Sequence, residues 1–178
     1  AGSINTWNWD FGNGNTSSVP SPSNLYSTSG NFNVRLIIAS DFGCRDTMEN
    51  PVVVNALPIA DAGLPQSICP GFNATLNGSG GSIYDWNIGA FTTASITVSP
   101  AATTTYNLLV TDANGCQNTA STTVTVNPVP NADAGVNQSI CFGESTTLYA
   151  TGGTNYIWSP GSITTPDYNI TPASSGSY

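Results

Sequence analysis

The sequence predicts an all-β protein built of tandem β-sandwich modules, on three observations. Stretches of chain return at a constant spacing of 72 residues, so that Ala-Asp-Ala-Gly occurs at 60–63 and 132–135 and Trp86 returns as Trp158. Residues 59–89 are identical to residues 131–161 at 16 of 31 positions, without a gap. Short apolar-alternating segments are separated by Gly, Asn and Pro turn signals, and no segment has a helical period. A fixed period of this kind indicates an array of one small module.

The period divides the 178 residues into one complete module and parts of two others. We expect an N-terminally truncated module at 1–57, a complete module at 58–129 and a C-terminally truncated module at 130–178. The third module stops before a counterpart of residues 107–127. The two ends of the chain are therefore expected to be edges of a longer array.

The strands of the first module are predicted from alternating apolar residues. Residues 7–14 form an aromatic strand that runs into a Gly/Asn turn, and residues 15–31 form a polar loop. Apolar residues at every second position from Phe32 predict a strand with one face in a core. The chain then turns at residues 41–43 and returns at 51–54.

The second module contains six predicted strands, and the third module is expected to repeat them. Their spacing, with turn signals between them, is typical of an immunoglobulin-type sandwich. Asp112 opens a tight hairpin, and Pro58, Pro128 and Pro130 mark linkers too short to act as loose tethers. The modules should therefore stack end to end as a semi-rigid rod. The predicted strands are 66–69, 73–77, 83–87, 94–99, 105–111 and 121–127.

Composition excludes several classes of protein. Two cationic against ten acidic residues give a net charge of −8, which repels nucleic acid. No apolar run reaches the roughly 20 residues of a membrane helix, and no signal segment opens the chain. The chain has no His and no Lys, so His-based acid–base, nucleophile and metal chemistry are absent. An enzyme is not expected, although the chain could be a spacer attached to one.

Repeated aromatic residues allow two interpretations. Trp9, Trp86 and Trp158, with repeated tyrosines, could form a platform for sugar rings. Alternatively they pack in the module core, as a central-strand Trp does in immunoglobulin sandwiches. We favour the core for these three Trp residues and for Tyr106, because the Trp holds a fixed place in the repeat.

Aspartates near the module junctions also allow two interpretations. Asp61 and Asp133 directly follow the linkers, and Asp112 should lie at the same pole of the second module as Asp61. Oxygen ligands converging there could hold Ca²⁺, which requires the Asp61 and Asp112 oxygens to lie within about 6 Å of each other. The favoured alternative is a side-chain-capped turn at each position. No other cofactor is expected.

The four cysteines, Cys44, Cys69, Cys116 and Cys141, occupy fixed places in the repeat, as in the disulfide framework of a secreted protein. In an immunoglobulin-type sandwich Cys69 ends the first strand at the far pole, whereas Cys116 begins the last strand at the near pole. These poles are about 25 Å or more apart, too far for a disulfide. We therefore predict bridges between successive modules, so that all four cysteines lack a partner within this chain.

Residues 9–14, Trp-Asp-Phe-Gly-Asn-Gly, resemble the signature turn of PKD (polycystic kidney disease) domains, with Asn13 where that motif usually has Asp. The 72-residue unit is similar to the repeats of large surface adhesins of gliding Bacteroidota, the SprB-type gliding adhesins included. The shared patterns are Ala-Asp-Ala-Gly, Ile-Cys-x-Gly, Trp-Ser-Pro-Gly and Asp-Ala-Asn-Gly-Cys. The resemblance implies a secreted, cell-surface protein of the type IX secretion and gliding-motility systems.

The expected function is that of a structural and adhesive stalk segment in such an adhesin. The expected partners are neighbouring modules of the same chain, and surface glycans or other adhesin or outer-membrane proteins. Whether the rods bundle into filaments stays open. Two alternatives remain: a carbohydrate-binding array that uses the repeated Trp and Tyr residues, and a set of spacer modules in a larger secreted enzyme.

Overall fold

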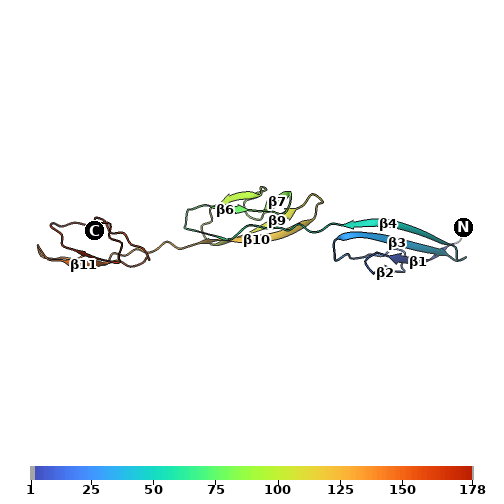
Figure 1. Ribbon diagram of the computed structural model, residues 1–178, viewed down its shortest axis with the longest axis horizontal. Helices are drawn as coiled ribbons and strands as arrows, with labels where there is room; N and C mark the ends of the chain where they lie inside the picture. Colours follow the sequence, from blue (N-terminus) through green and yellow to red (C-terminus); the bar gives the residue numbers. More distant parts are fainter. Residues whose placement is uncertain (1–2, 178) are drawn as a thin grey trace.

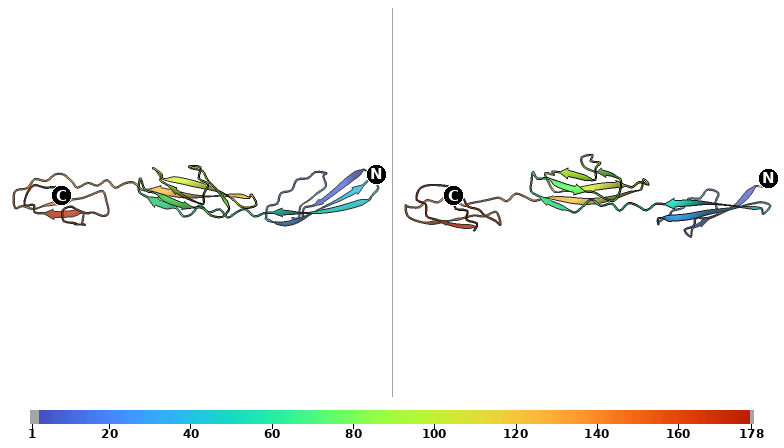
Figure 2. Two further views of the ribbon diagram at one scale, coloured as in Figure 1. Left: turned by 90° about the horizontal axis from the view of Figure 1, so that it is seen from above. Right: turned by 45° about the horizontal axis from the view of Figure 1, so that its top comes forward.

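The computed structural model describes residues 3–177, which form twelve β-strands and no helix. The strands gather into units that follow one another along the long axis, with β1–β4 at one end of the molecule and β11 at the other (Figure 1). Two further views show the same elongated arrangement, with extended segments between the units (Figure 2). No helix in the described part of the chain is long and apolar enough to cross a membrane. The predicted all-β class is confirmed.

The first repeat, residues 1–57, contains one antiparallel sheet in the order β2-β1-β3-β4. The predicted aromatic strand and loop are present, with a two-residue strand inside the loop. The return strand was predicted too short: it begins at residue 45, because residues 45–50 pair with β3 although they are exposed and polar for the most part. The strands are β1 (Ile4–Asp10), β2 (Thr16–Ser17), β3 (Gly30–Ser40) and β4 (Arg45–Val54).

The second repeat, residues 58–129, is a two-layer sandwich. One sheet has the order β5-β10-β9-β7 and the other pairs β6 with β8. Alternate residues of β6 and β8 are buried, as expected for strands with one face in a core. The strands are β5 (Gln66–Ile68), β6 (Ala74–Asn77), β7 (Ile83–Trp86), β8 (Ser95–Val98), β9 (Thr104–Thr111) and β10 (Gln117–Val126).

The core of the second repeat lies between these two sheets. Its largest fully buried side chains come from four strands, and each is at most 1% exposed. They are Leu76, Trp86, Leu108, Val110 and Val124. Such interdigitation of two inner faces defines a β-sandwich, so the predicted sandwich fold is confirmed.

Strand polarity carries the chain from one pole of the second repeat to the other. β5 and β10 run parallel, with Gln66 opposite Val124 and Ile68 opposite Val126. β10 begins at Gln117, four residues earlier than predicted, because its first half pairs with β9. The chain therefore enters the repeat at one end and leaves it at the other.

The third repeat, residues 130–178, reproduces only part of this plan. β11 (Thr146–Tyr149) pairs with β12 (Asp167–Ile170) as β6 pairs with β8. The expectation of further strands at 138–141 and 155–159 is wrong for this structure. In the second repeat the corresponding strands pair with β10 and β9, and the described part of the third repeat includes neither counterpart.

Candidate functional site

The repeated tryptophans lie inside the repeats. Trp86 is 1% exposed and donates its indole N–H to the Thr93 carbonyl at 3.1 Å. Trp158 is 5% exposed and donates to the Thr165 carbonyl at the same distance, 72 residues further along. Tyr106 is also buried in the second core. The Trp86 ring therefore offers no face to a sugar, which removes the main site of the predicted carbohydrate array.

The tryptophans of the first repeat are less enclosed. Trp7 and Trp9 are both half-buried. The Trp9 ring stacks on Phe11 with centroids 6.1 Å apart, and its indole N–H donates to the Val19 carbonyl at 3.1 Å. The described residues of this repeat include no second sheet that could cover the Trp9 face.

The aspartates predicted as Ca²⁺ ligands each cap a turn. An Asp61 carboxylate oxygen accepts the Gly63 N–H at 2.8 Å, and Asp133 accepts the Gly135 N–H at the same distance. Both glycines have φ of 79°, a left-handed conformation in which glycine is least strained. These are side-chain-capped turns of the kind that Asp favours.

Asp112 caps the hairpin between β9 and β10. One of its carboxylate oxygens accepts the N–H of Asn114 at 2.8 Å and that of Cys116 at 2.9 Å. Within residues 3–177 no three His, Cys, Asp or Glu side chains group as a metal site. The Ca²⁺ site at the junctions therefore stays a prediction, and the contacts seen are those of the capped turns.

The four cysteines carry free thiols in the described structure. Cys44, Cys69 and Cys141 are exposed and Cys116 is half-buried. Cys69 follows β5 and lies beside the end of β10, where the Asn127 N–H donates to the Ile68 carbonyl at 2.9 Å. Cys116 directly precedes Gln117 at the other end of β10. The two ends of this ten-residue strand are roughly 30 Å apart, so a bridge within the repeat is excluded, and bridges between repeats stay a prediction.

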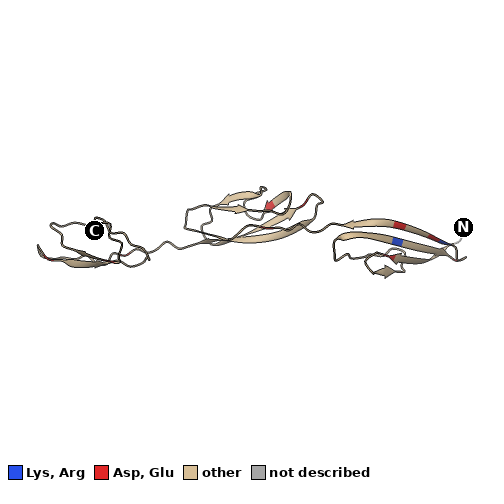
Figure 3. Cartoon of the chain, viewed as in Figure 1, with Lys and Arg blue, Asp and Glu red and all other residues tan. Residues whose placement is uncertain are grey.

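Charged groups are sparse along the molecule, and most of those on strands belong to the first repeat (Figure 3). The ion pair between Arg35 and Asp10 has a separation of 3.6 Å and both side chains are about half exposed. Such exposed pairs contribute little to stability. One ionisable group is perturbed in the second core, where burial raises the pKa of the Tyr106 phenol.

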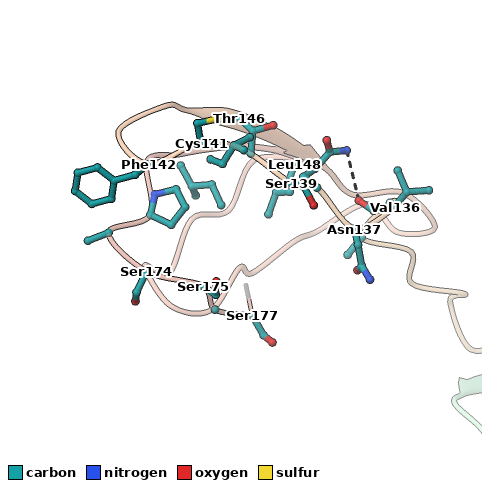
Figure 4. A pocket seen from close by; sticks show the side chains of 18 of the residues that line it. Val136, Asn137, Ser139, Cys141, Phe142, Thr146, Leu148, Ser174, Ser175 and Ser177 are labelled. Atoms are coloured by element: carbon teal, nitrogen blue, oxygen red, sulfur yellow. Dashed lines mark hydrogen bonds between the residues drawn. The ribbon is translucent and has the colours of Figure 1, made fainter.

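A groove in the third repeat, lined by both polar and apolar residues, is the feature that sequence reasoning missed. A groove of about 790 Å³ lies between the β11–β12 layer and the segments around residues 136–142 and 172–177 (Figure 4). Leu148, Trp158 and Ile170 contribute apolar surface to it. The 72-residue offset is the signal that could have predicted it, because these three positions match the core residues Leu76, Trp86 and Val98.

Comparison with known proteins finds relatives for part of the chain. Residues 1–54 match the family described as "PKD domain". A 64-residue stretch is 41% identical to the "Pre-pro-metalloprotease PrtV" of two Vibrio cholerae O1 strains. It covers 34% of this chain, and the chain spans only 7% of the length of that relative.

Several solved structures are similar to the chain at low identity. Fibronectin(III)-like modules of Clostridium thermocellum CbhA match with 10% identity and a TM-score of 0.36, over 71% of this chain and 80% of theirs. The N-terminal eight Ig domains of DSCAM match with 15% identity and a TM-score of 0.33, over 93% and 32%. The Bacteroides ovatus protein SGBP-B, in complex with a mixed-linkage heptasaccharide, matches with 18% identity and a TM-score of 0.22, over 93% and 60%. The sheet topology of the second repeat is that of an immunoglobulin-type β-sandwich, and residues 1–54 are similar to a PKD domain.

Proposed function

We propose that this chain is a load-bearing stalk segment of a secreted, repetitive cell-surface adhesin. The observation that carries the proposal is the polarity of the second repeat. Its first and last strands are parallel neighbours, so the points at which the chain enters and leaves lie at opposite poles. Repeats connected in this way extend along one line, which is the arrangement that the figures display (Figures 1 and 2).

This polarity also sets how the repeat responds to a pulling force. Tension applied at the two linkers acts along β5 and β10 in opposite directions and loads their hydrogen bonds together, in shear. The pairing of residues 66–68 with 124–126 and the Asn127–Ile68 hydrogen bond must then break at once before the core opens. Antiparallel neighbours pulled from one end would instead open one hydrogen bond at a time.

The surface supports a passive role. Ser, Thr, Asn and Gly make up 82 of the 178 residues, and only 7% of residues are charged. Salt therefore has little charge to screen, and the shape of the array should be nearly independent of ionic strength. The finer assignment, a SprB-type gliding adhesin exported by type IX secretion, rests on the sequence resemblance and belongs to this proposal. Surface glycans and outer-membrane proteins are its proposed partners.

Two measurements test the stalk. Small-angle scattering of the full chain should give an elongated particle, and a compact globule would contradict the proposal. Single-molecule pulling should find a lower unfolding force for Asn127→Pro, which removes the N–H that bonds to Ile68. Asn55→Pro is the matched control at the same position of the first repeat, where the described residues include no counterpart of β5. Equal forces for all three proteins would count against loading of the β5–β10 pair.

A second candidate is an accessory module of a larger secreted enzyme, favoured by the 41% identity to a stretch of a pre-pro-metalloprotease. Antibodies raised against the chain separate the two functions in the producing organism. Retention of a very large antigen on the cell surface supports the adhesin. Release of the antigen together with a proteolytic activity supports the accessory module.

A further inference from the structure

The linker that enters the second repeat is bound along that repeat before its first strand begins. Pro58 is buried, although it stands between two repeats. Asp61 forms an antiparallel bridge with Ser79, with backbone hydrogen bonds of 3.1 and 2.8 Å. Ala62 is 2% exposed and belongs to the second core. Residues 58–62 are therefore part of the second repeat and do not act as a free tether.

One side chain of β10 holds the start of this segment. Asn118 donates its Nδ2 to the Pro58 carbonyl at 2.9 Å, across 60 positions of sequence. Its Oδ1 accepts the Thr119 N–H at 2.9 Å. A carbonyl can only accept and a backbone N–H can only donate, so these two neighbours fix the orientation of the amide. Both ends of the Asn118 side chain are thus engaged.

A glycine turn contacts the next residues of the linker. At Gly80, where φ is 107°, an added Cβ would overlap the Ile59 carbonyl oxygen and would lie 3.1 Å from the Ala60 Cα. The same contact occurs 72 residues later, where a Cβ at Gly152 would overlap the Asn131 carbonyl oxygen. Glycine allows two stretches of backbone to approach each other this closely. The linker therefore lies directly against the backbone of the turn.

These contacts leave a short joint between the first and second repeats. The last pair of the β3–β4 ladder is Gly30 with Val54. Residues 55–57 follow it, are all exposed, and precede the buried Pro58. Three residues span at most about 10 Å, so the first repeat stays close to the end of the second. The direction of the first repeat then depends on what fixes Pro58.

We infer that Asn118 is a positioning residue that clamps the linker and holds the first repeat in line with the second. Asn118 is the second residue of β10, and the chain leaves the repeat from the other end of the same strand. The clamp therefore attaches the incoming chain to the start of the strand that carries the outgoing chain. Figure 1 shows β10 along the second repeat between the two extended linkers. The clamp would act in the same way in an adhesin and in an accessory module.

The matching residue of the first repeat shows what the clamp requires. Asp46 stands 72 positions before Asn118, and its Oδ1 accepts the Thr47 N–H at 2.8 Å as Asn118 accepts that of Thr119. A carboxylate keeps this acceptor but has no N–H to donate to a carbonyl. Asp is therefore compatible with the strand geometry at this position but lacks the donor. Asn118→Asp should retain the fold of β10 and release Pro58.

Nuclear magnetic resonance of the weakly aligned full chain tests the clamp. In the parent, the residual dipolar couplings of the first and second repeats should fit one alignment tensor, because the joint holds the two repeats in line. In Asn118→Asp the released population of the joint should rise by about fivefold, the ratio that one typical net hydrogen bond gives. The two repeats should then lose their common tensor, with weaker alignment of the first repeat.

Two further variants control for charge. Gln117→Glu adds the same charge one residue earlier, where the side chain points to the opposite face of β10 and contacts Thr111. It should keep the common tensor. Asn118→Ala removes the donor without adding a charge and should loosen the joint as Asn118→Asp does. A common tensor retained in both Asn118 variants, or equal loosening in Gln117→Glu, would overturn the inference.

A glycine pair reaches the same joint without changing β10. Gly80→Ala places a methyl group against the Ile59 carbonyl and should displace the linker from its seat. Gly71→Ala is the matched control, because Gly71 also has a positive φ, of 84°, but an added Cβ there meets nothing within 4 Å. The common tensor should be lost in Gly80→Ala and kept in Gly71→Ala. If both keep it, the direction of the first repeat does not depend on the bound linker, and the inference is wrong.

Discussion

The second and third repeats share their local hydrogen bonds but differ in the closure of their cores. The antiparallel bridge of Asp61 with Ser79 returns as Asp133 with Thr151, and the Tyr84–Gly81 hydrogen bond returns as Tyr156–Gly153. Ala90 and Ser162 even share the same positive φ of 52°. Yet Leu76 is 1% exposed, whereas Leu148 is half-buried beside an open groove.

This difference distinguishes local hydrogen bonding from the closure of the core by more distant strands. The shared hydrogen bonds join residues at most 18 positions apart, and they recur even where the two repeats differ in sequence, as at Ser79 and Thr151. Core closure depends on β9 and β10, which in the second repeat begin 18 and 31 residues beyond Trp86 of β7. A repeat therefore has its turns without these strands, but its core is only partly closed: Trp158 and Ile170 are buried, whereas Leu148 is half-buried.

The largest expected effect is on stability, and it compares the tryptophan of the second repeat with that of the third. Trp86→Ala should destabilise the second repeat by about 3–5 kcal/mol, because it removes a fully enclosed ring and leaves a cavity. Trp158→Ala should cost clearly less, since one wall of its site is a groove. Urea unfolding of the two variants, with the parent chain as control, measures both losses. Equal losses would show that the third repeat is as well packed as the second.

A glycine pair gives the next largest effect. Gly81→Ala forces a methyl group against Val110 and should destabilise the second repeat by about 1–3 kcal/mol through overpacking. Gly153→Ala meets nothing closer than 3.5 Å and should leave stability within about 0.5 kcal/mol of the parent. Thermal unfolding of the two variants measures the contrast. A Gly153→Ala loss as large as that of Gly81→Ala would mean that the space at Gly153 is filled in solution.

Much of the second repeat was predictable from sequence, because its strands alternate apolar and polar residues and its turns carry Gly, Asn and Asp. The buried Trp86 followed from its fixed place in the repeat, and the separation of Cys69 from Cys116 followed from strand polarity. The early start of β10 was not predictable from its own residues, because Gln117 and Asn118 carry no strand signal. Their pairing with Thr111 and Val110 supplies it.

The third repeat shows where prediction from sequence fails. Residues 138–141 repeat the sequence of a β-strand identically but are not a strand in the described structure. Sequence identity predicted the element, whereas its strand state requires a hydrogen-bonded neighbour. The groove could not be predicted for the same reason. Residue types show which face of a strand is apolar, but they do not show whether another strand covers that face.

Alkaline pH should destabilise the second repeat through its buried Tyr106. Burial raises the pKa of Tyr106 above its usual value of about 10, so the folded second repeat holds the phenol neutral while the unfolded chain ionises. This preference costs nothing below the unfolded pKa, and stability is lost progressively as pH rises above about 10. Urea unfolding at rising pH should show a shallower loss for Tyr106→Phe than for the parent. Tyr84→Phe is the control, and identical slopes for Tyr106→Phe and the parent would contradict a buried phenol.

The smallest expected effect concerns the capped turns, and there the two repeats should behave alike. Asp61→Ala and Asp133→Ala each remove one 2.8 Å acceptor from a glycine N–H, a loss of about 1 kcal/mol locally. Because each turn is bridged to a strand segment of its own repeat, it does not depend on β9 or β10. Amide hydrogen exchange at Gly63 and Gly135 should therefore accelerate by a similar factor in the two variants. If exchange at Gly135 is already fast in the parent chain, the turn also requires a closed core. The distinction between local hydrogen bonds and core closure would then be wrong even for these turns.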